Sequence, residues 1–342
     1  MEVALSILIP PIMPPILLLP CFLPGTSILT PTGERTVETL APGDLVLTLG
    51  GAVRPIVWIG TGKTLATSGR RTAATPVIVH KGAFGPNVPN LDLHVTKGHA
   101  FYLEGVLIPA EFLVNHRSIV WDDRAQEVTV FHIQLETHDI LIANGAAAES
   151  YRDDGNRWLF QNADESRAMP ASPACAPVMT GGAVVDAAWR RYLDLAGPRP
   201  SLMLTDDPDL HVMIDGTLSE ASAREAGFAV FCLPQASKDV RLLSRATVPQ
   251  EIGLARDARC LGVAIRRIII RKGARCRTMD AADPALVDGF HAFEAGNRVR
   301  WTDGDAGLPG SLFDGFTGPV ELVVNLGGNT QYSVESRVRR AA

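Results

Sequence analysis

The sequence predicts a mainly β protein: an all-β region, then a linker with a short helix, then a second β region of sandwich type. Short apolar runs recur along the chain and are separated by Gly, Pro, Asp and Asn, which is typical of strands and turns. One small, polar, proline-containing stretch divides these runs into two groups. The length of 342 residues suits two domains of ordinary size.

Charge and cysteine usage exclude several function classes. The formal net charge of −5, without an offsetting basic block, argues against a nucleic-acid partner. The five cysteines are widely spaced and form no CxxC pair, and no His–carboxylate set has metal-ligand spacing, so we expect no metal and no cofactor. Cys21 has the most unusual position, and the others (Cys175, Cys232, Cys260 and Cys276) are expected to be buried or incidental thiols.

Residues 1–20 form an apolar leader. Its five prolines would repeatedly break a helix, which argues against a membrane span. No Lys or Arg precedes Arg35, so the basic start of a secretory signal is missing as well. A degraded signal, a short propeptide and a misassigned start remain as alternatives, and both a cytoplasmic and a secreted location stay open.

The first β region is expected to cover residues 21–152. Its expected strands are "SILT", "LVLT", "PIVWIG", "PVIV", "LHVT", "VTVFHIQL" and "DILIA". Turns are expected at Pro42-Gly43-Asp44, Gly50-Gly51 and Asn144-Gly145, because glycine accepts a positive φ and proline presets its own φ.

A linker is expected over residues 153–182, and a C-terminal domain over residues 183–342. The domain would open with a helix over 183–197, with Val184, Ala188, Tyr192 and Leu195 on one face and Gly197 as its stop. The expected strands after it are "LHVMID", "GFAVFCL", "VRLLSR", "LGVAIRRIII", "RVRWT", "PVELVVNL" and "TQYSVES". The basic run "RRIIIRKGARCR" is interpreted as a strand and its turn.

Three pieces of the first region carry residues suited to chemistry. Cys21 is followed by Gly25-Thr26, then "LHVTKGHAFYLEGVLIPAEFL" contains Thr96 and His99, and "FHIQLETHDILIANG" contains His132 and His138. With the Gly43-Asp44 turn, these motifs resemble a Hint module, the fold of inteins and of Hedgehog autoprocessing domains, and more narrowly a bacterial Hint-containing group. The resemblance covers about 130 residues of the chain.

The resemblance implies self-processing at the Pro20–Cys21 bond. The Cys21 thiolate would attack the Pro20 carbonyl, give a thioester and free the Cys21 amine. His99 would transfer the proton to that amine, Thr96 would hold the scissile amide and the tetrahedral oxygen, and His138 would assist. His132 is a weaker, supporting candidate.

Two departures from the family pattern limit this chemistry. Splicing needs a terminal Asn that cyclises, usually after His, but Ala148 and Glu149 stand near those positions. We therefore expect cleavage without splicing. Pro20 crowds the carbonyl before Cys21 and restricts how the bond can be strained. The chemical identity of the nucleophile that would attack the thioester is not predicted.

Each site residue also has a structural interpretation. Cys21 can be a small core residue, and Thr96 with His99 can form a hydrogen-bonded turn. His132 lies within a strand pattern, where a structural role is the commoner one. His80, His94 and His116 are interpreted as structural or surface residues, because their spacing suits no metal.

The second region supports an alternative function. Its stretch "GFHAFEAGNRVRWTDGDAGLP" gathers one aromatic side chain, carboxylates and an arginine: Glu294, Arg300, Trp301, Asp303 and Asp305. Such groups can bind sugars by stacking and bidentate hydrogen bonds, although a core tryptophan beside a surface turn is the commoner arrangement. The alternative is a catalytically silent Hint scaffold whose C-terminal domain binds a carbohydrate or a protein.

Overall fold

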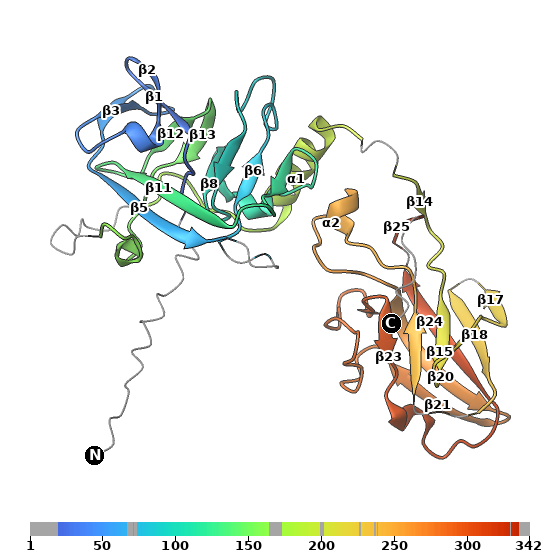
Figure 1. Ribbon diagram of the computed structural model, residues 1–342. Helices are drawn as coiled ribbons and strands as arrows, with labels where there is room; N and C mark the ends of the chain where they lie inside the picture. Colours follow the sequence, from blue (N-terminus) through green and yellow to red (C-terminus); the bar gives the residue numbers. More distant parts are fainter. Residues whose placement is uncertain are drawn as a thin grey trace, which may run out of the picture. The chain divides into compact units, whose positions relative to one another are not determined.

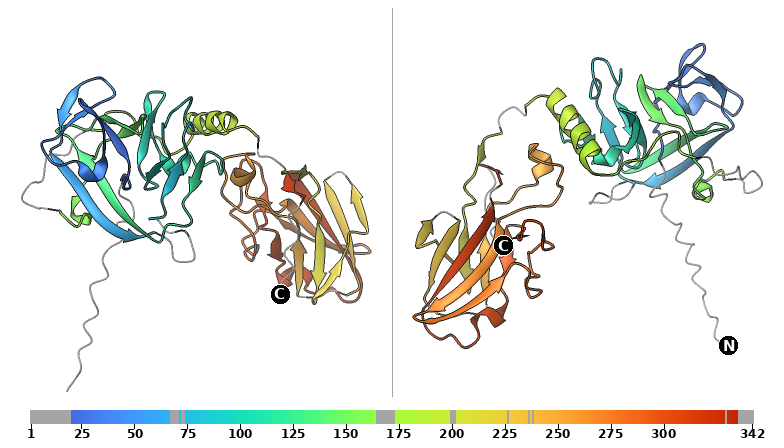
Figure 2. Two further views of the ribbon diagram at one scale, coloured as in Figure 1. Left: turned by 45° about the horizontal axis from the view of Figure 1, so that its top comes forward. Right: turned by 180° about the vertical axis from the view of Figure 1, so that it is seen from behind.

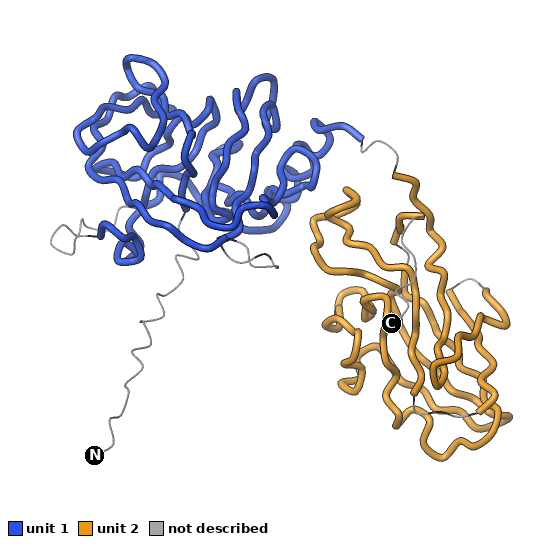
Figure 3. Tube along the Cα trace, in the orientation of Figure 1, with its two compact units in different colours: residues 1–198 blue, residues 199–342 orange. Residues whose placement is uncertain are grey.

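The computed structural model describes residues 20–66, 71, 74–163, 173–198, 202–225, 227–235, 237, 239–328 and 330–334. The chain divides into two compact units, Met1–Pro198 and Arg199–Ala342, which are described separately (Figure 3). Residues 1–19 of the predicted leader, residues 164–172 of the predicted linker and the end of the last predicted strand lie outside the described residues.

The first unit is built from short strands, which confirms the predicted mainly β class (Figure 1). Its strands are β1 (Ser27–Thr30), β2 (Gly33–Thr36), β3 (Leu45–Leu47), β4 (Val53–Pro55), β5 (Trp58–Leu65), β6 (Val77–Val79), β7 (Leu93–Val95), β8 (Ala100–Leu103), β9 (Val106–Pro109), β10 (Ile119–Trp121), β11 (Glu127–Gln134), β12 (Ile140–Ala143) and β13 (Ala146–Glu149). Short 3₁₀ turns are η1 (Val37–Thr39), η2 (Ala110–Phe112) and η3 (Arg157–Leu159).

The strands of the first unit form several antiparallel sheets. The largest has the order β2-β1-β12-β13-β8-β9, while β10-β6-β7, β11-β5 and β3-β4 form smaller ones. Phe22 pairs on one side with Phe131 of β11 and on the other with Val95 of β7. This single residue therefore bridges the β11-β5 pair and the β10-β6-β7 sheet.

The turn at Asn144-Gly145 connects β12 and β13 as the sequence predicts. Both residues have positive φ, +46° and +77°, which matches a tight hairpin turn. The Asn144 side chain accepts a hydrogen bond from Ser27 N at 2.7 Å and donates one to Asp92 O at 3.1 Å. It thereby fixes the start of β1 and the loop before β7 to this hairpin.

The helix α1 (Ala183–Leu195) belongs to the first unit, which differs from the predicted boundary at residue 183. It buries Val185, Ala188, Trp189, Tyr192 and Leu193, and the Trp189 indole donates to Val114 O at 2.7 Å. The predicted apolar face is wrong at Val184 and Leu195, which are exposed, because the buried i, i+3, i+4, i+7 row starts one residue later.

Much of the predicted linker also packs on the first unit. Asn162 bonds to the backbone of Thr61 and Ile59 at 2.8 Å each, and Phe160 is buried. Residues 173–179 lie along β9 through Leu107. Together with α1, these contacts show that the first unit continues to Pro198, because the chain after β13 covers apolar surface that would otherwise be exposed.

An aromatic cluster stands over the β5–β11 pair. Trp58 contacts Tyr151 and Phe160, with ring centroids 5.3 and 5.0 Å apart. Gly60 of β5 lies opposite His132 of β11 in the pairing register. A Cβ at Gly60 would come within 2.5 Å of the Trp58 ring and 2.6 Å of the Phe160 ring, so only glycine leaves room for both rings.

The second unit contains two antiparallel sheets that share one core, as expected of a sandwich (Figures 1 and 2). One sheet has the order β16-β15-β19-β23, and the other has β17-β18-β24-β20-β21 with β22 beside β20. The elements are β14 (Leu204–Thr205), β15 (His211–Ile214), β16 (Thr217–Ser219), β17 (Ala223–Glu225), β18 (Phe228–Leu233), β19 (Val240–Leu243), α2 (Pro249–Ile252), β20 (Ala264–Lys272), β21 (Arg275–Asp280), β22 (Arg300–Trp301), β23 (Asp305–Gly307), η5 (Gly310–Phe313), β24 (Val320–Gly328) and β25 (Tyr332–Ser333).

All five cysteines are free, and Cys21 is the buried one. Of the four thiols predicted to be buried or incidental, Cys175, Cys232 and Cys276 are exposed; β18 and β21 turn the latter two toward the outer face of their sheet. Within the described part of the chain, the helices are too short or too polar to cross a membrane.

Substituting Gly60→Ala should destabilise the first unit by about 1–3 kcal/mol, because the added methyl group overpacks Trp58 and Phe160. Gly50→Ala is the matched control, since nothing lies within 4 Å of the Cβ it would gain. Chemical denaturation followed by tryptophan fluorescence measures both. Equal stability of the two variants would contradict the packing argument.

Candidate functional site

The segment Cys21–Leu23 is held from both sides by backbone hydrogen bonds. Phe22 N donates to Phe131 O at 2.8 Å, and Phe131 N donates back to Phe22 O at 2.9 Å. On the other side Leu23 N donates to His94 O at 3.1 Å and Thr96 N donates to Cys21 O at 2.9 Å. Because side chains alternate along such a segment, Phe22 enters the main core while Cys21 and Leu23 pack with the Trp58 cluster.

Thr96 contacts the amide of Cys21 directly. It follows β7, and its Oγ1 accepts the Cys21 N–H at 2.8 Å in a buried environment. The next turn is closed by His99 N, which donates to Thr96 O at 3.0 Å. The Cys21 nitrogen belongs to the Pro20–Cys21 bond, and its role in cleavage stays a prediction. Among the described residues, none donates a hydrogen bond to the Pro20 carbonyl oxygen.

His99 and His132 are fully buried next to each other. Their ring centroids are 5.3 Å apart, and the His99 ring lies 4.2 Å from that of Phe22. Burial, with a smaller contribution from His138, lowers the pKa of His99 to about 3. Burial, followed by the charges of His99 and His138, also holds the pKa of His132 well below its usual 6.5. Both rings are therefore neutral at physiological pH.

His138 faces a buried carboxylate. Its Nε2 lies 3.5 Å from Glu149 Oε2, and its side chain is 1% exposed. Glu149 ends β13, and its Oε1 accepts the Ala100 N–H at 2.8 Å. The sequence marks Glu149 only as the residue near the position of the terminal Asn. It gives no sign of the contact between Glu149 and His138.

The Cys21 thiol is protonated in this environment. Burial raises its pKa well above the usual 9.0, and the negative charge of Glu149 raises it further. A thiolate here therefore requires a proton acceptor, because both burial and the Glu149 carboxylate disfavour the charged form.

The predicted site residues Cys21, Thr96, His99, His132 and His138 are all buried. The rings of His99 and His132 are in contact, and Thr96 is hydrogen-bonded to Cys21. His138 influences the protonation of both other histidines, and Glu149 that of Cys21. These groups thus form one electrostatically coupled cluster. Within the described residues, no group of His, Cys, Asp and Glu is arranged to hold a metal ion.

Residues outside the predicted set complete the surroundings. Tyr151 packs on His132 with ring centroids 5.2 Å apart, and its hydroxyl donates to Asn156 Oδ1 at 2.7 Å. Arg157 lies over the Trp58 ring at 4.0 Å and donates to Gln134 at 2.8 Å. His80 and His94 face Asp92 and Asp122 in partly exposed pairs.

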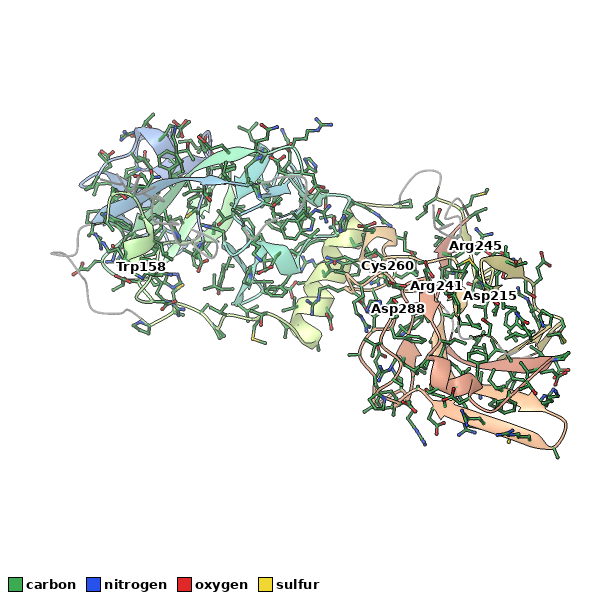
Figure 4. The ribbon with its side chains drawn as sticks, turned by 60° about the horizontal axis from the view of Figure 1, so that its bottom comes forward. Trp158, Asp215, Arg241, Arg245, Cys260 and Asp288 are labelled. Carbon is green, nitrogen blue, oxygen red and sulfur yellow. The ribbon has the colours of Figure 1, made fainter. Side chains whose placement is uncertain are left out.

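The polar residues singled out in the second unit contact other protein groups. Glu294 pairs with Arg259 at 2.8 Å, and Arg300 donates to Ala281 O at 2.8 Å. Arg241 pairs with Asp288 at 2.7 Å (Figure 4). It also pairs with Asp305 at 2.6 Å. These contacts give the carboxylates and the arginines structural partners, and ligand binding by this unit stays a prediction.

Comparison with known proteins places this site within a family. Residues 20–155 match the family model described as "Hint domain". Similar solved structures include the gp41-1 intein, at 13% identity over 38% of this chain and 97% of that chain with a TM-score of 0.27. They also include the intein-like domain from Clostridium thermocellum, at 17% identity over 38% and 98% with a TM-score of 0.27, and the MchDnaB-1 intein, at 17% over 38% and 99% with a TM-score of 0.27. No curated protein matches the sequence.

The family match gives the class of this part of the first unit: residues 20–155 are similar to a Hint domain. The domain covers Cys21, Thr96, His99, His132, His138 and Glu149, while residues 156–198 of the first unit follow it.

The buried histidines predict a pH-dependent stability. His99 and His132 stay neutral in the folded state, but in the unfolded chain each takes up a proton near pH 6.5, so stability is full above that pH and falls below it. Between pH 8 and pH 5 the free energy of unfolding should fall by about 2 kcal/mol per histidine.

Denaturant unfolding of the Cys21→Ala protein, which lacks the predicted nucleophile, measures this dependence. His132→Gln in the same background should remove about half of it. A free energy of unfolding that does not change between pH 8 and pH 5 would contradict the neutral state of both rings.

Proposed function

We propose that the Hint domain cleaves its own chain at the Pro20–Cys21 bond, through an N–S acyl shift and without splicing. One observation carries this proposal above all: the N–H of Cys21, the leaving group of that bond, is hydrogen-bonded to Thr96 Oγ1 at 2.8 Å. Cys21 itself is buried, and Glu149 is near enough for its charge to raise the pKa of the thiol. An inert core cysteine needs neither the Thr96 contact nor this carboxylate.

The reaction needs one proton acceptor and one proton donor. The Cys21 thiol loses its proton as the sulfur attacks the Pro20 carbonyl carbon and a C–S bond forms. The tetrahedral intermediate collapses when the C–N bond breaks, and the nitrogen of Cys21 takes up a proton to leave as an amine. A neutral histidine can accept the first proton and return it to the nitrogen; His99 is the proposed carrier, with His132 and His138 in support. Water or a thiol then cleaves the thioester.

The proposed reaction does not include splicing, because the C-terminal end of the Hint domain lacks the side-chain amide that splicing needs. A side-chain amide at the terminal position is what cyclises in splicing, whereas Glu149 offers a carboxylate. The Glu149 oxygens are also engaged by Ala100 N–H and by His138. Cleavage would therefore leave the second unit attached to the first.

A second candidate function has support of its own. The Cys21 thiol has a raised pKa, and His99, with a pKa of about 3, is a weak base. Both favour a silent scaffold, in which the second unit acts as a carbohydrate- or protein-binding domain. In that case Cys21 and the histidines contribute only to packing.

A tagged chain separates the two candidates. With a tag ahead of Met1, mass spectrometry should detect a fragment that ends at Pro20, and thiol or hydroxylamine should increase its yield because both attack a thioester. The rate should rise with pH through pH 9, because the thiol, whose pKa is raised, gains thiolate over that range. Cys21→Ala should abolish the fragment. A chain that stays intact with hydroxylamine at pH 9 would favour the scaffold.

The role of the amide contact can be tested at Thr96. Thr96→Val keeps the shape but removes the acceptor of the Cys21 N–H, and it should slow cleavage about tenfold or more. Thr96→Ser keeps the hydroxyl and is the matched control, expected near the original rate. The single-turnover rate of fragment release measures both variants, and equal rates would remove Thr96 from the mechanism.

A further inference from the structure

A short segment beyond the matched domain reaches back to the buried cluster. Residues 173–179, called the strap here, pair in parallel with β9 at Leu107. Leu107 N donates to Pro177 O and Met179 N donates to Leu107 O, both at 2.8 Å. These two bonds fix the path of the strap on the first unit, although the Hint match ends at residue 155.

The strap contacts a candidate catalytic histidine through its backbone. The amide N–H of Cys175 donates to His138 Nδ1 at 3.0 Å. A ring nitrogen that accepts a hydrogen bond carries no proton, so in the neutral ring the proton must be on Nε2. An imidazolium, with protons on both nitrogens, would lose this bond.

The opposite edge of the same ring faces Glu149. His138 Nε2 is 3.5 Å from Glu149 Oε2, and the second carboxylate oxygen is held by Ala100 N–H at 2.8 Å. The side chains are 1% and 11% exposed, so solvent competes little for either group. A proton on Nε2 therefore lies on the edge of the ring nearest the carboxylate, whereas a proton on Nδ1 would leave the Nε2 lone pair beside its negative charge.

We propose that the strap, through the Cys175 N–H, fixes His138 as the neutral tautomer protonated at Nε2 and so orients its proton toward Glu149. Cys175 is a positioning residue that acts through its backbone, and its thiol is not needed. The contribution of this positioning to catalysis rests on the proposed cleavage at Cys21. Through Cys175, processing would depend on residues that follow the Hint domain.

The test compares two residues at position 175 that differ only in whether they carry the backbone N–H donor. Cys175→Ala removes the thiol and keeps the N–H, whereas Cys175→lactate, introduced as an α-hydroxy acid, replaces the N–H by an ester oxygen. Cys175→Pro is a simpler variant that also lacks the N–H. In the full-length Cys21→Ala background, which cannot process itself, ¹⁵N–¹H correlation spectra of labelled histidine show which nitrogen of His138 carries the proton.

We expect Nε2–H alone in Cys175→Ala and a shift of roughly tenfold in the tautomer ratio in the ester variant, the size of one net hydrogen bond. The same tautomer ratio in both variants would overturn the proposal, whether or not the chain cleaves. With Cys21 restored, cleavage by Cys175→Ala should equal that of the original chain, and the ester variant should be slower. A strap-dependent tautomer in a chain that never cleaves would refute the proposed function and leave the positioning intact.

Discussion

The backbone pairing of Phe22 between β7 and β11 is the constraint on which the first unit depends. One residue closes the gap between two groups of strands and carries a large ring into the main core. Since Cys21 directly precedes Phe22, the same pairing places the Cys21 amide within hydrogen-bond distance of Thr96. Fold and candidate chemistry thus share one anchor, and a slip of the segment by one residue would exchange the faces of Cys21 and Phe22.

Burial of the histidines sets the electrostatics of the site. Low-dielectric surroundings disfavour any charged ring, which keeps His99 and His132 neutral and the Cys21 thiol protonated. Glu149 introduces a carboxylate among these groups, held by one backbone N–H and faced by one imidazole. Such a site holds no resting thiolate, so in the proposed cleavage each proton would move in step with bond formation, and the orientation of the rings would affect the barrier.

The sequence predicted the strands, the turns and the candidate residues because these depend on local patterns. Alternating apolar runs placed most strands, and a glycine that needs a positive φ marked the Asn144-Gly145 hairpin. The role of Glu149 could not be predicted, since its partners Ala100 and His138 are brought to it only by the pairing of β12, β13 and β8. The same limit explains the domain boundary, because a helix pattern shows which face is apolar but not which unit that face covers.

The contacts of the chain that follows β13 explain why the proposed cleavage would be confined to the N-terminal end of the Hint domain. Ser150 exchanges backbone and side-chain hydrogen bonds with Asp139, and Tyr151 N donates to Ile133 O at 2.7 Å. Tyr151 and Phe160 then fill the space beside Trp58, each side chain contributing roughly 1.5–3 kcal/mol by burial. A break after Glu149 would release segments that cover the site and hold His138. These contacts extend beyond residue 155, whereas a break before Cys21 would leave all of them in place.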